Sequence, residues 1–172
     1  MPVLPDVLQP DLDIIFCGTA PGTVSAQRGA YYANAGNAFW RTLFEVGLTP
    51  QQVSPVDFQS ITQYKLGLTD LAKQVYGADS SLKKSDFAPN DLRRKILHCT
   101  PKVLAFTSKR AGQEFLGGKV HYGLQAEKIG NTVLFVLPSP SGLARSHWSI
   151  KPWCDLAKLV NSVPSTSTIQ LI

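Results

Sequence analysis

The chain has 172 residues, of which 44% are hydrophobic, and its 17 Lys and Arg residues outweigh 12 Asp and Glu residues to give a net charge of +5. This length fits one domain with a sizeable core, so we expect a single domain over residues 1–172. No apolar run approaches the roughly 20 residues that span a membrane, and Met1–Asp6 lacks signal-peptide features, so we expect a cytoplasmic protein.

Strand-like apolar runs alternate with segments of helical spacing along the chain. In chain order, the pattern predicts a strand at 12–17, a helix at 37–46, a short helix within 50–65, a short strand or a turn at 65–71 and a polar loop at 76–90. It then predicts a helix from 90 or 91 to 99, a strand at 102–106, a helix at 108–116, a strand at 132–137 and a helix at 151–160. This alternation predicts a parallel-rich, three-layer α/β domain, to which the tail 164–172 is peripheral.

The first predicted helix has a clear apolar face. Asn37 is its expected N-cap, and Phe39, Trp40, Leu43 and Phe44 are expected to be buried on one side.

The three cysteines, Cys17, Cys99 and Cys154, are widely scattered and form no Cys-x-x-Cys pair. This spacing argues against zinc and iron–sulfur sites, so we expect reduced thiols, no metal ion and no organic cofactor.

Two loops of small residues, Gly18–Ser25 and Pro138–Arg145, directly follow predicted buried strands. Ligands of open α/β sheets bind beyond the carboxyl ends of the strands. The first loop presents backbone N–H groups with little side-chain bulk, which suits an anion or a planar base. Tyr31 and Tyr32 are able to stack on such a base, although an ordinary half-buried aromatic pair remains an alternative.

The second loop places an apolar side chain beside a cation. Leu143 is suited to push between stacked bases, and Arg145 to hold a phosphate or read a base edge; a solvated turn remains the alternative. Neither a phosphate-loop motif nor a dinucleotide-binding glycine motif is present.

Four groups of residues, in consistent order and spacing between about residues 12 and 160, resemble the uracil-DNA glycosylase superfamily, and most closely its mismatch-specific uracil and thymine glycosylase branch. They are Phe16-Cys17-Gly18-x-x-Pro21-Gly22-x-x-Ser25, Tyr32 with Asn37-x-Phe39-Trp40, Gly67-Leu68-Thr69, and Leu137-Pro138-Ser139-Pro140-Ser141-Gly142-Leu143-x-Arg145. The resemblance implies a four-stranded, mainly parallel sheet between helices. It also implies a monomeric, monofunctional DNA repair enzyme that flips uracil from DNA and hydrolyses its N-glycosidic bond.

Position by position, the resemblance also implies roles in the site. The base-binding residues would be Gly18, Thr19, Ala20, Tyr32, Asn37 and Ser139, and the DNA-binding residues Gly22, Ser25, Ser141, Gly142, Leu143 and Arg145. Three basic clusters are candidates for a diffuse basic face on single- or double-stranded DNA, and the alternative for each is an ordinary solvated cluster: Lys83-Lys84, Arg93-Arg94-Lys95 and Lys109-Arg110.

Ala20 departs from the branch, which usually has an asparagine there to position the attacking water. Ser139 also stands where other branches have asparagine or histidine. Two further residues are therefore catalytic candidates. Asp70 would accept a proton from water, stabilise the oxocarbenium ion or bind the base, and the alternative is a turn or N-cap aspartate. His147 would donate to the departing base, and the alternative is a surface histidine beside Trp148.

Three other functions remain open at this point. One is the same fold acting on hypoxanthine, xanthine or mismatched thymine. Another is a module that binds damaged DNA and hydrolyses it poorly, because Ala20 replaces the usual residue. The last is an unrelated α/β nucleotide-binding protein.

Overall fold

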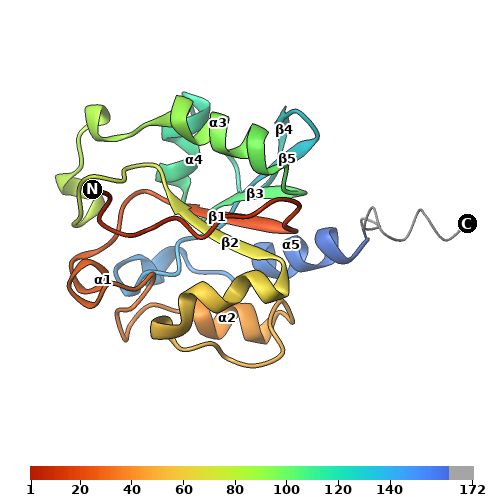
Figure 1. Ribbon diagram of the computed structural model, residues 1–172, viewed down its shortest axis with the longest axis horizontal. Coiled ribbons are helices and arrows are strands. Elements are labelled where there is room, and N and C mark those ends of the chain that lie inside the picture. Colours follow the sequence, from red (N-terminus) through yellow and green to blue (C-terminus); the bar gives the residue numbers. More distant parts are fainter. Residues whose placement is uncertain (163–172) are drawn as a thin grey trace, which may run out of the picture.

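The computed structural model describes residues 1–162 and has a sheet of five strands between two layers of helices (Figure 1). The strand order is β2-β1-β3-β5-β4, in which β4 alone is antiparallel to its neighbour. The strands are β1 (Ile14–Gly18), β2 (Leu66–Asp70), β3 (Val103–Phe106), β4 (Gly123–Ile129) and β5 (Thr132–Val136). The three-layer α/β fold is confirmed, and the sheet has one strand more than the four expected.

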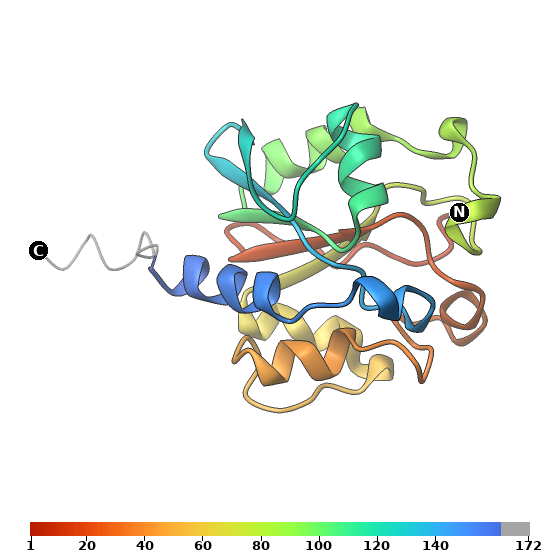
Figure 2. The ribbon, with the colours of Figure 1, turned by 180° about the vertical axis from the view of Figure 1, so that it is seen from behind.

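Helices cover both faces of the sheet (Figures 1 and 2). They are α1 (Thr23–Arg28), α2 (Phe39–Glu45), α3 (Pro89–Cys99), α4 (Lys109–Leu116) and α5 (Lys151–Ser162), with 3-10 helices η1 (Pro55–Tyr64), η2 (Asp79–Ser81), η3 (Lys84–Asp86) and η4 (Gly142–His147). The layer of α3 and α4 lies above the sheet in Figure 1, and α2, η1 and α5 lie below it. The expected peripheral tail, 164–172, lies outside the described residues.

The central strands are buried on both faces, which explains their nearly continuous apolar sequence. In β1, Phe16 faces the lower layer, where its ring lies 5.2 Å from Phe39 of α2 and 6.0 Å from Trp153 of α5. Its neighbours Ile15 and Cys17 pack on the opposite side, in the cluster that includes residues of α3 and α4. Alternate residues of each strand thus build two separate cores.

Helix α2 differs from its prediction in two details. It begins at Phe39, and the side chain of Asn37 accepts a hydrogen bond from the Phe39 N–H (2.9 Å). Asn37 therefore pairs one of the N–H groups of the first turn, although it lies two residues before the helix. The expected burial of Phe44 was wrong, because this side chain is 45% exposed while Trp40 and Leu43 fill the stripe that faces the core.

The N-terminal strap, residues 3–7, runs along the edge of β2 that β1 leaves free. Val7 and Leu68 exchange two backbone hydrogen bonds of 2.9 Å, and the Val3 N–H donates to the Lys73 carbonyl (2.7 Å). Gly67 permits this close approach, since a Cβ there would lie 2.6 Å from the Val7 carbonyl oxygen.

The four parallel strands end at one edge of the sheet. β2 and β3 flank β1 on opposite sides, so the chain changes its direction of travel across the sheet at β1. Such a switch point is where open α/β sheets bind ligands, and the loop after β1 begins there. Within residues 1–162, no helix combines the length and apolar character needed to cross a membrane.

We expect Gly67→Ala to lower the free energy of unfolding by about 2 kcal/mol, because the added methyl group overlaps the Val7 carbonyl oxygen of the strap and the side chain of Leu12. Gly118→Ala is the matched control, since nothing lies within 4 Å of a Cβ at that position. Urea unfolding of both variants measures the difference. Equal stability of the two variants would show that no close contact restricts the residue at position 67.

Candidate active site

A cavity of about 630 Å³ opens at the carboxyl edge of the sheet. Its walls come from the loops that follow β1 and β5, the turn at 31–37 and residues 77–79. Nearly all of the site residues expected from the sequence line it: Gly18, Thr19, Ala20, Gly22, Ser25, Tyr32, Asn37, Asp70, Ser139, Ser141, Gly142, Leu143 and Arg145. The exception is His147.

Asp70 is the last residue of β2 and lies opposite Gly18 in the register of β1. Its side chain lines the cavity, yet the residue is only 5% exposed. Its Oδ1 atom would lie 2.9 Å from a Cβ at position 18, so any side chain larger than that of glycine would displace the carboxylate. Its Oδ2 atom is buried and has no hydrogen-bond partner in the structure described.

Burial raises the pKa of Asp70 from 3.8 to about 7, against the opposing effect of the Lys73 charge. A carboxyl group of this pKa exchanges its proton near neutral pH. A buried carboxylate with an unpartnered oxygen and a perturbed pKa in a cavity is typical of a functional site.

Two hydroxyl groups face Asp70 across Gly18. The Tyr32 and Thr107 hydroxyl oxygens lie 3.0 Å apart, and each is 3.4 Å from the same Cβ position over Gly18. Three oxygens therefore converge above this glycine. Sequence reasoning missed Thr107, although a polar residue directly after a buried parallel strand was an available signal.

The backbone of Tyr32 is in the left-handed region, with φ of 51°, which is unusual for a bulky residue. Its ring stacks on Phe39, with 3.9 Å between centroids and 22° between planes. This packing fixes an unfavourable backbone conformation and directs the hydroxyl group towards Thr107.

The first loop is tied to residues that follow β2. The Thr19 hydroxyl donates to the Asp79 carboxylate (2.7 Å), and the Gly77 N–H donates to the Pro21 carbonyl (2.9 Å). Arg110 in α4 in turn donates to the Asp79 carbonyl (3.0 Å). These bonds bring Asp79, which the sequence did not single out, to the wall of the cavity.

Ser25 is only 6% exposed, and its hydroxyl oxygen accepts the Ala33 N–H (3.1 Å). It therefore holds the turn that carries Tyr32. The expected contact between Ser25 and a DNA phosphate stays a prediction: the residue lines the cavity, but little of its side chain is exposed there.

The second loop presents an apolar side chain to solvent. The Ser141 hydroxyl oxygen accepts the Leu143 N–H (3.2 Å), and the Ala38 N–H donates to the Pro140 carbonyl (2.9 Å), which joins the loop to α2. Leu143 is 91% exposed at the rim of the cavity. The turn therefore presents this apolar side chain to solvent at the mouth of the cavity.

His147 is exposed in η4 and does not line the cavity. The structure does not bring it to Asp70, so the expected catalytic role for His147 has no geometric support. It belongs to no metal site either, since no group of three or more His, Cys, Asp or Glu residues within 1–162 is arranged to hold a metal ion.

A family model of the uracil DNA glycosylase superfamily matches residues 5–157. The chain belongs to this superfamily. A solution NMR structure from Methanosarcina acetivorans, of a protein proposed to be a uracil DNA glycosylase, superposes with a TM-score of 0.62 over 92% of this chain and 96% of that chain. The two sequences are 21% identical, so this likeness bears on the fold alone.

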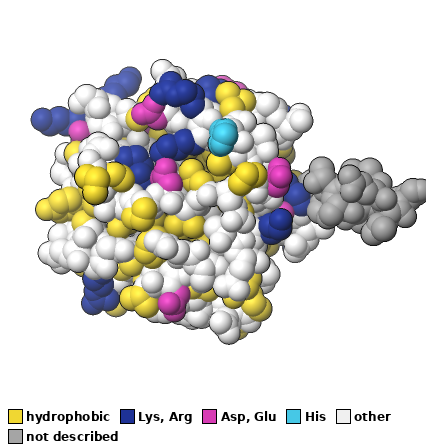
Figure 3. Space-filling view, in the orientation of Figure 1, with side chains coloured by type: hydrophobic (Ala, Val, Ile, Leu, Met, Phe, Trp, Pro, Cys, Tyr) yellow, Lys and Arg dark blue, Asp and Glu magenta, His cyan; other side chains and the backbone are white. Residues whose placement is uncertain are grey.

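The glycosylase carries many of its positive charges on the α3 side of the molecule, as Figure 3 shows. Several are paired with carboxylates rather than left for a ligand: Arg94 binds Asp91, and Arg110 binds Glu114 at 3.1 Å. The basic clusters expected from the sequence are thus in part paired with carboxylates of α3 and α4.

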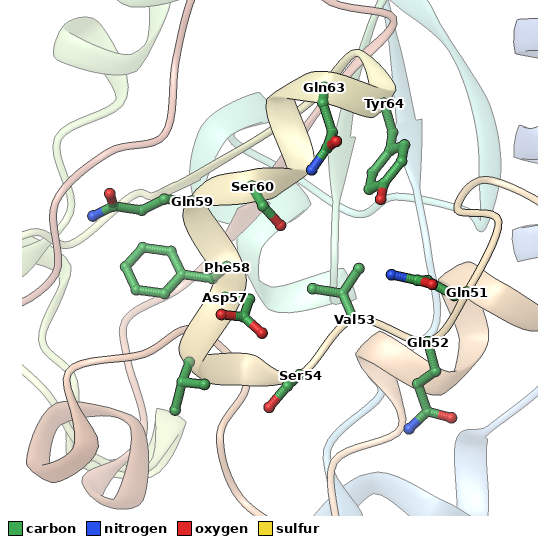
Figure 4. A pocket seen from close by; sticks show the side chains of 11 residues that line it. Gln51, Gln52, Val53, Ser54, Asp57, Phe58, Gln59, Ser60, Gln63 and Tyr64 are labelled. Carbon is green, nitrogen blue, oxygen red and sulfur yellow. The ribbon is translucent and has the colours of Figure 1, made fainter.

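A second cavity of the glycosylase, of about 610 Å³, lies along the segment 51–64. In Figure 4 the side chains of Gln51, Ser60, Gln63 and Tyr64 turn towards Val53. Its wall consists of amides, hydroxyls and apolar groups with one carboxylate, and includes none of the residues that the sequence singled out. The cavity at the sheet edge is therefore the candidate active site.

We expect Asp70→Asn to make the folded protein more stable at pH 8. The folded pKa of about 7 lies above the ordinary 3.8, so the folded state binds this proton more tightly, and stability falls as pH rises from about 4 to about 7. The difference between the two pKa values corresponds to at most about 4 kcal/mol. Urea unfolding of wild type and variant between pH 4 and pH 9 measures it.

The gain from Asp70→Asn should shrink as pH falls towards 4, because the wild-type carboxyl group is then protonated in the folded state and begins to be protonated in the unfolded state, whose pKa is near 3.8. A variant that is less stable than wild type at pH 8, or a gain in stability that does not depend on pH, would contradict a raised pKa of Asp70 in the folded state.

Proposed function

We propose that this glycosylase removes uracil from DNA by a monofunctional reaction that leaves an abasic site. The observation that carries the proposal is the buried, unpartnered carboxylate of Asp70 at the floor of a cavity formed by the two motif loops. A carboxylate and hydroxyl groups suit attack by water, whereas a lyase reaction would require an amine nucleophile.

In the proposed reaction, the flipped nucleotide places its C1′ atom above Gly18. A water molecule held among Asp70, Thr107 and Tyr32 attacks C1′ while the bond from C1′ to N1 of uracil breaks. The bonding electron pair leaves with the base, and Asp70 accepts the proton of the water. Its negative charge also stabilises the oxocarbenium ion that develops on the sugar. Ala20, which has no polar side-chain atom, takes no part in this step.

The base would lie between the first loop and the tyrosine turn. Tyr32 is proposed as its stacking surface, because Phe39 already holds this ring from behind. The backbone of Gly18, Thr19 and Ala20 is proposed to approach the base, with Asn37 and Ser139 on the wall of the same cavity.

The second loop would hold the duplex. Leu143 is proposed to fill the gap that the flipped base leaves, and its exposure at the cavity rim supports this role. Arg145 is exposed beside it and is proposed to contact a phosphate. Gly22, Ser141 and Gly142 are small residues that let the DNA backbone approach closely.

The first test measures base release from oligonucleotides that carry one uracil, with enzyme in excess and alkali to reveal abasic sites. We expect cleavage by wild type, with a rate constant that falls about tenfold per pH unit well below pH 7, because only ionised Asp70 accepts the proton. Asp70→Asn should lower the rate constant at pH 8 by about 100-fold or more.

Oligonucleotides with hypoxanthine, xanthine or mismatched thymine are the matched controls. Release of one of these bases without release of uracil would contradict uracil as the substrate. Tight binding of DNA without release of any base would contradict glycosylase activity. An undiminished rate constant in Asp70→Asn would contradict the role of Asp70 as the base.

We expect Leu143→Ala to slow uracil release about tenfold or more on duplex DNA and little on single strands, because only a paired and stacked base resists flipping. Val56→Ala is a control, since Val56 is also exposed (74%) and lies in η1, away from the active-site cavity. Single-turnover rates on both substrates measure the effect. An equal loss of rate on duplex and single-stranded DNA would exclude Leu143 as a wedge.

A further inference from the structure

A cluster of charged side chains lies beside β2, outside the lining of the active-site cavity. Asp6 of the N-terminal strap lies 2.7 Å from the ammonium group of Lys73 and 2.7 Å from that of Lys95 in α3. It also accepts a hydrogen bond of 2.7 Å from the hydroxyl group of Thr69, the residue before Asp70. The proposed mechanism uses none of these side chains.

The charges of this cluster do not cancel. Burial alone would raise the pKa of Asp6, but hydrogen bonds from Lys73 and Lys95, the charge of Lys73 and the hydrogen bond from Thr69 together outweigh burial and hold that pKa below its usual 3.8. Asp6 is therefore ionised at neutral pH. One carboxylate joined to two ammonium groups leaves one net positive charge beside the strand that ends in Asp70.

Lys73 is held firmly within the cluster. Besides the Asp6 carboxylate, its ammonium group contacts the Tyr31 hydroxyl (3.2 Å), and that hydroxyl donates to the Pro5 carbonyl of the strap (2.9 Å). Its side chain is only 14% exposed. A charge so fixed and shielded from water acts more strongly on its neighbours than a surface lysine does.

The backbone keeps Lys73 near Asp70. After β2, the Leu71 N–H donates to the Gly18 carbonyl (3.0 Å) and the Ala72 N–H to the Thr19 carbonyl (2.8 Å), so the chain stays beside the first loop. Lys73 is the neighbour that lowers the pKa of Asp70 most. Asp6 opposes this effect and Lys95 adds to it.

The other titratable side chains that interact with Asp70 are Cys17 in β1 and the tyrosines 31 and 32. Burial first, and then the charge of Asp70, raise the pKa of each of these three groups. They are therefore uncharged at neutral pH and do not offset the negative charge of Asp70. The two lysines supply the compensating charge.

We propose that Lys73, clamped by Asp6 of the N-terminal strap, is a positioning residue that supplies the positive charge stabilising the Asp70 carboxylate. The inference rests on the proposed function for its effect on catalysis, because Asp70 acts there as a base. Asp6 and Lys73 thereby act on the active site although neither residue lines its cavity.

The decisive experiment titrates the Asp70 carboxyl carbon by NMR in the folded protein without DNA, using Asp70→Asn to assign the signal. We expect Lys73→Met to raise the Asp70 pKa by about one pH unit or more, and Lys73→Arg to leave it near the wild-type value. In single-turnover assays, the acidic limb of Lys73→Met should shift equally, with about fivefold slower release at pH 7 and recovery at pH 9.

Lys102→Met is the matched control. Lys102 is a partly buried lysine (24% exposed) that binds Asp13 at 3.1 Å. Asp13 and Lys102 directly precede β1 and β3, so they lie at the amino ends of the strands, away from Asp70 at the carboxyl ends. The inference is overturned if the Asp70 pKa is unchanged in Lys73→Met, or if Lys102→Met shifts it as much. If Lys73→Met does not fold, Lys95→Met must give a smaller shift in the same direction, and no shift would overturn the inference.

The two readouts separate this inference from the proposed function. A wild-type protein that releases no base contradicts the glycosylase activity, whereas the NMR titration still decides whether Lys73 stabilises the carboxylate.

Discussion

Asp70 carries a carboxylate that the fold removes from water at the end of β2, and the neighbouring structure is arranged around it. Gly18 has to lack a side chain, because a Cβ there would displace the carboxylate. Tyr32 is held in the left-handed region so that its hydroxyl group meets Thr107 over the same glycine. Strain and an unsatisfied oxygen gathered at one point are typical of a site that the rest of the fold stabilises.

The helices and parallel strands were predictable because their patterns are strong. The strands around β1 are buried on both faces and show as continuous apolar runs. β4 was missed because it is a partly exposed edge strand with the charged residues Glu127 and Lys128 in its interior. α1 was missed because its six residues are too few to show a periodicity.

The site was predictable only as far as it is local in sequence. Both loops follow recognisable strands, and Asp70 ends a third, so all three were found before the structure. Thr107 directly follows β3, which is a local signal, but its contact with Tyr32 spans 75 residues and is not visible in the sequence. Asp79 reaches the cavity through a contact with Thr19 across 60 residues, which no local pattern encodes. Ser25 belongs to the first motif, and in the structure its hydroxyl oxygen accepts a hydrogen bond from the Ala33 N–H in the tyrosine turn.

The N-terminal strap also affects how copies of this protein meet one another. A sheet edge with free N–H and C=O groups recruits strands from other chains, which leads to domain swapping and aggregation. The strap occupies that edge of β2 beside the candidate active-site cavity. On the other side of the sheet, the charged outer strand β4 has an irregular register against β5. Both borders of the sheet thus carry features that discourage the pairing of strands between molecules.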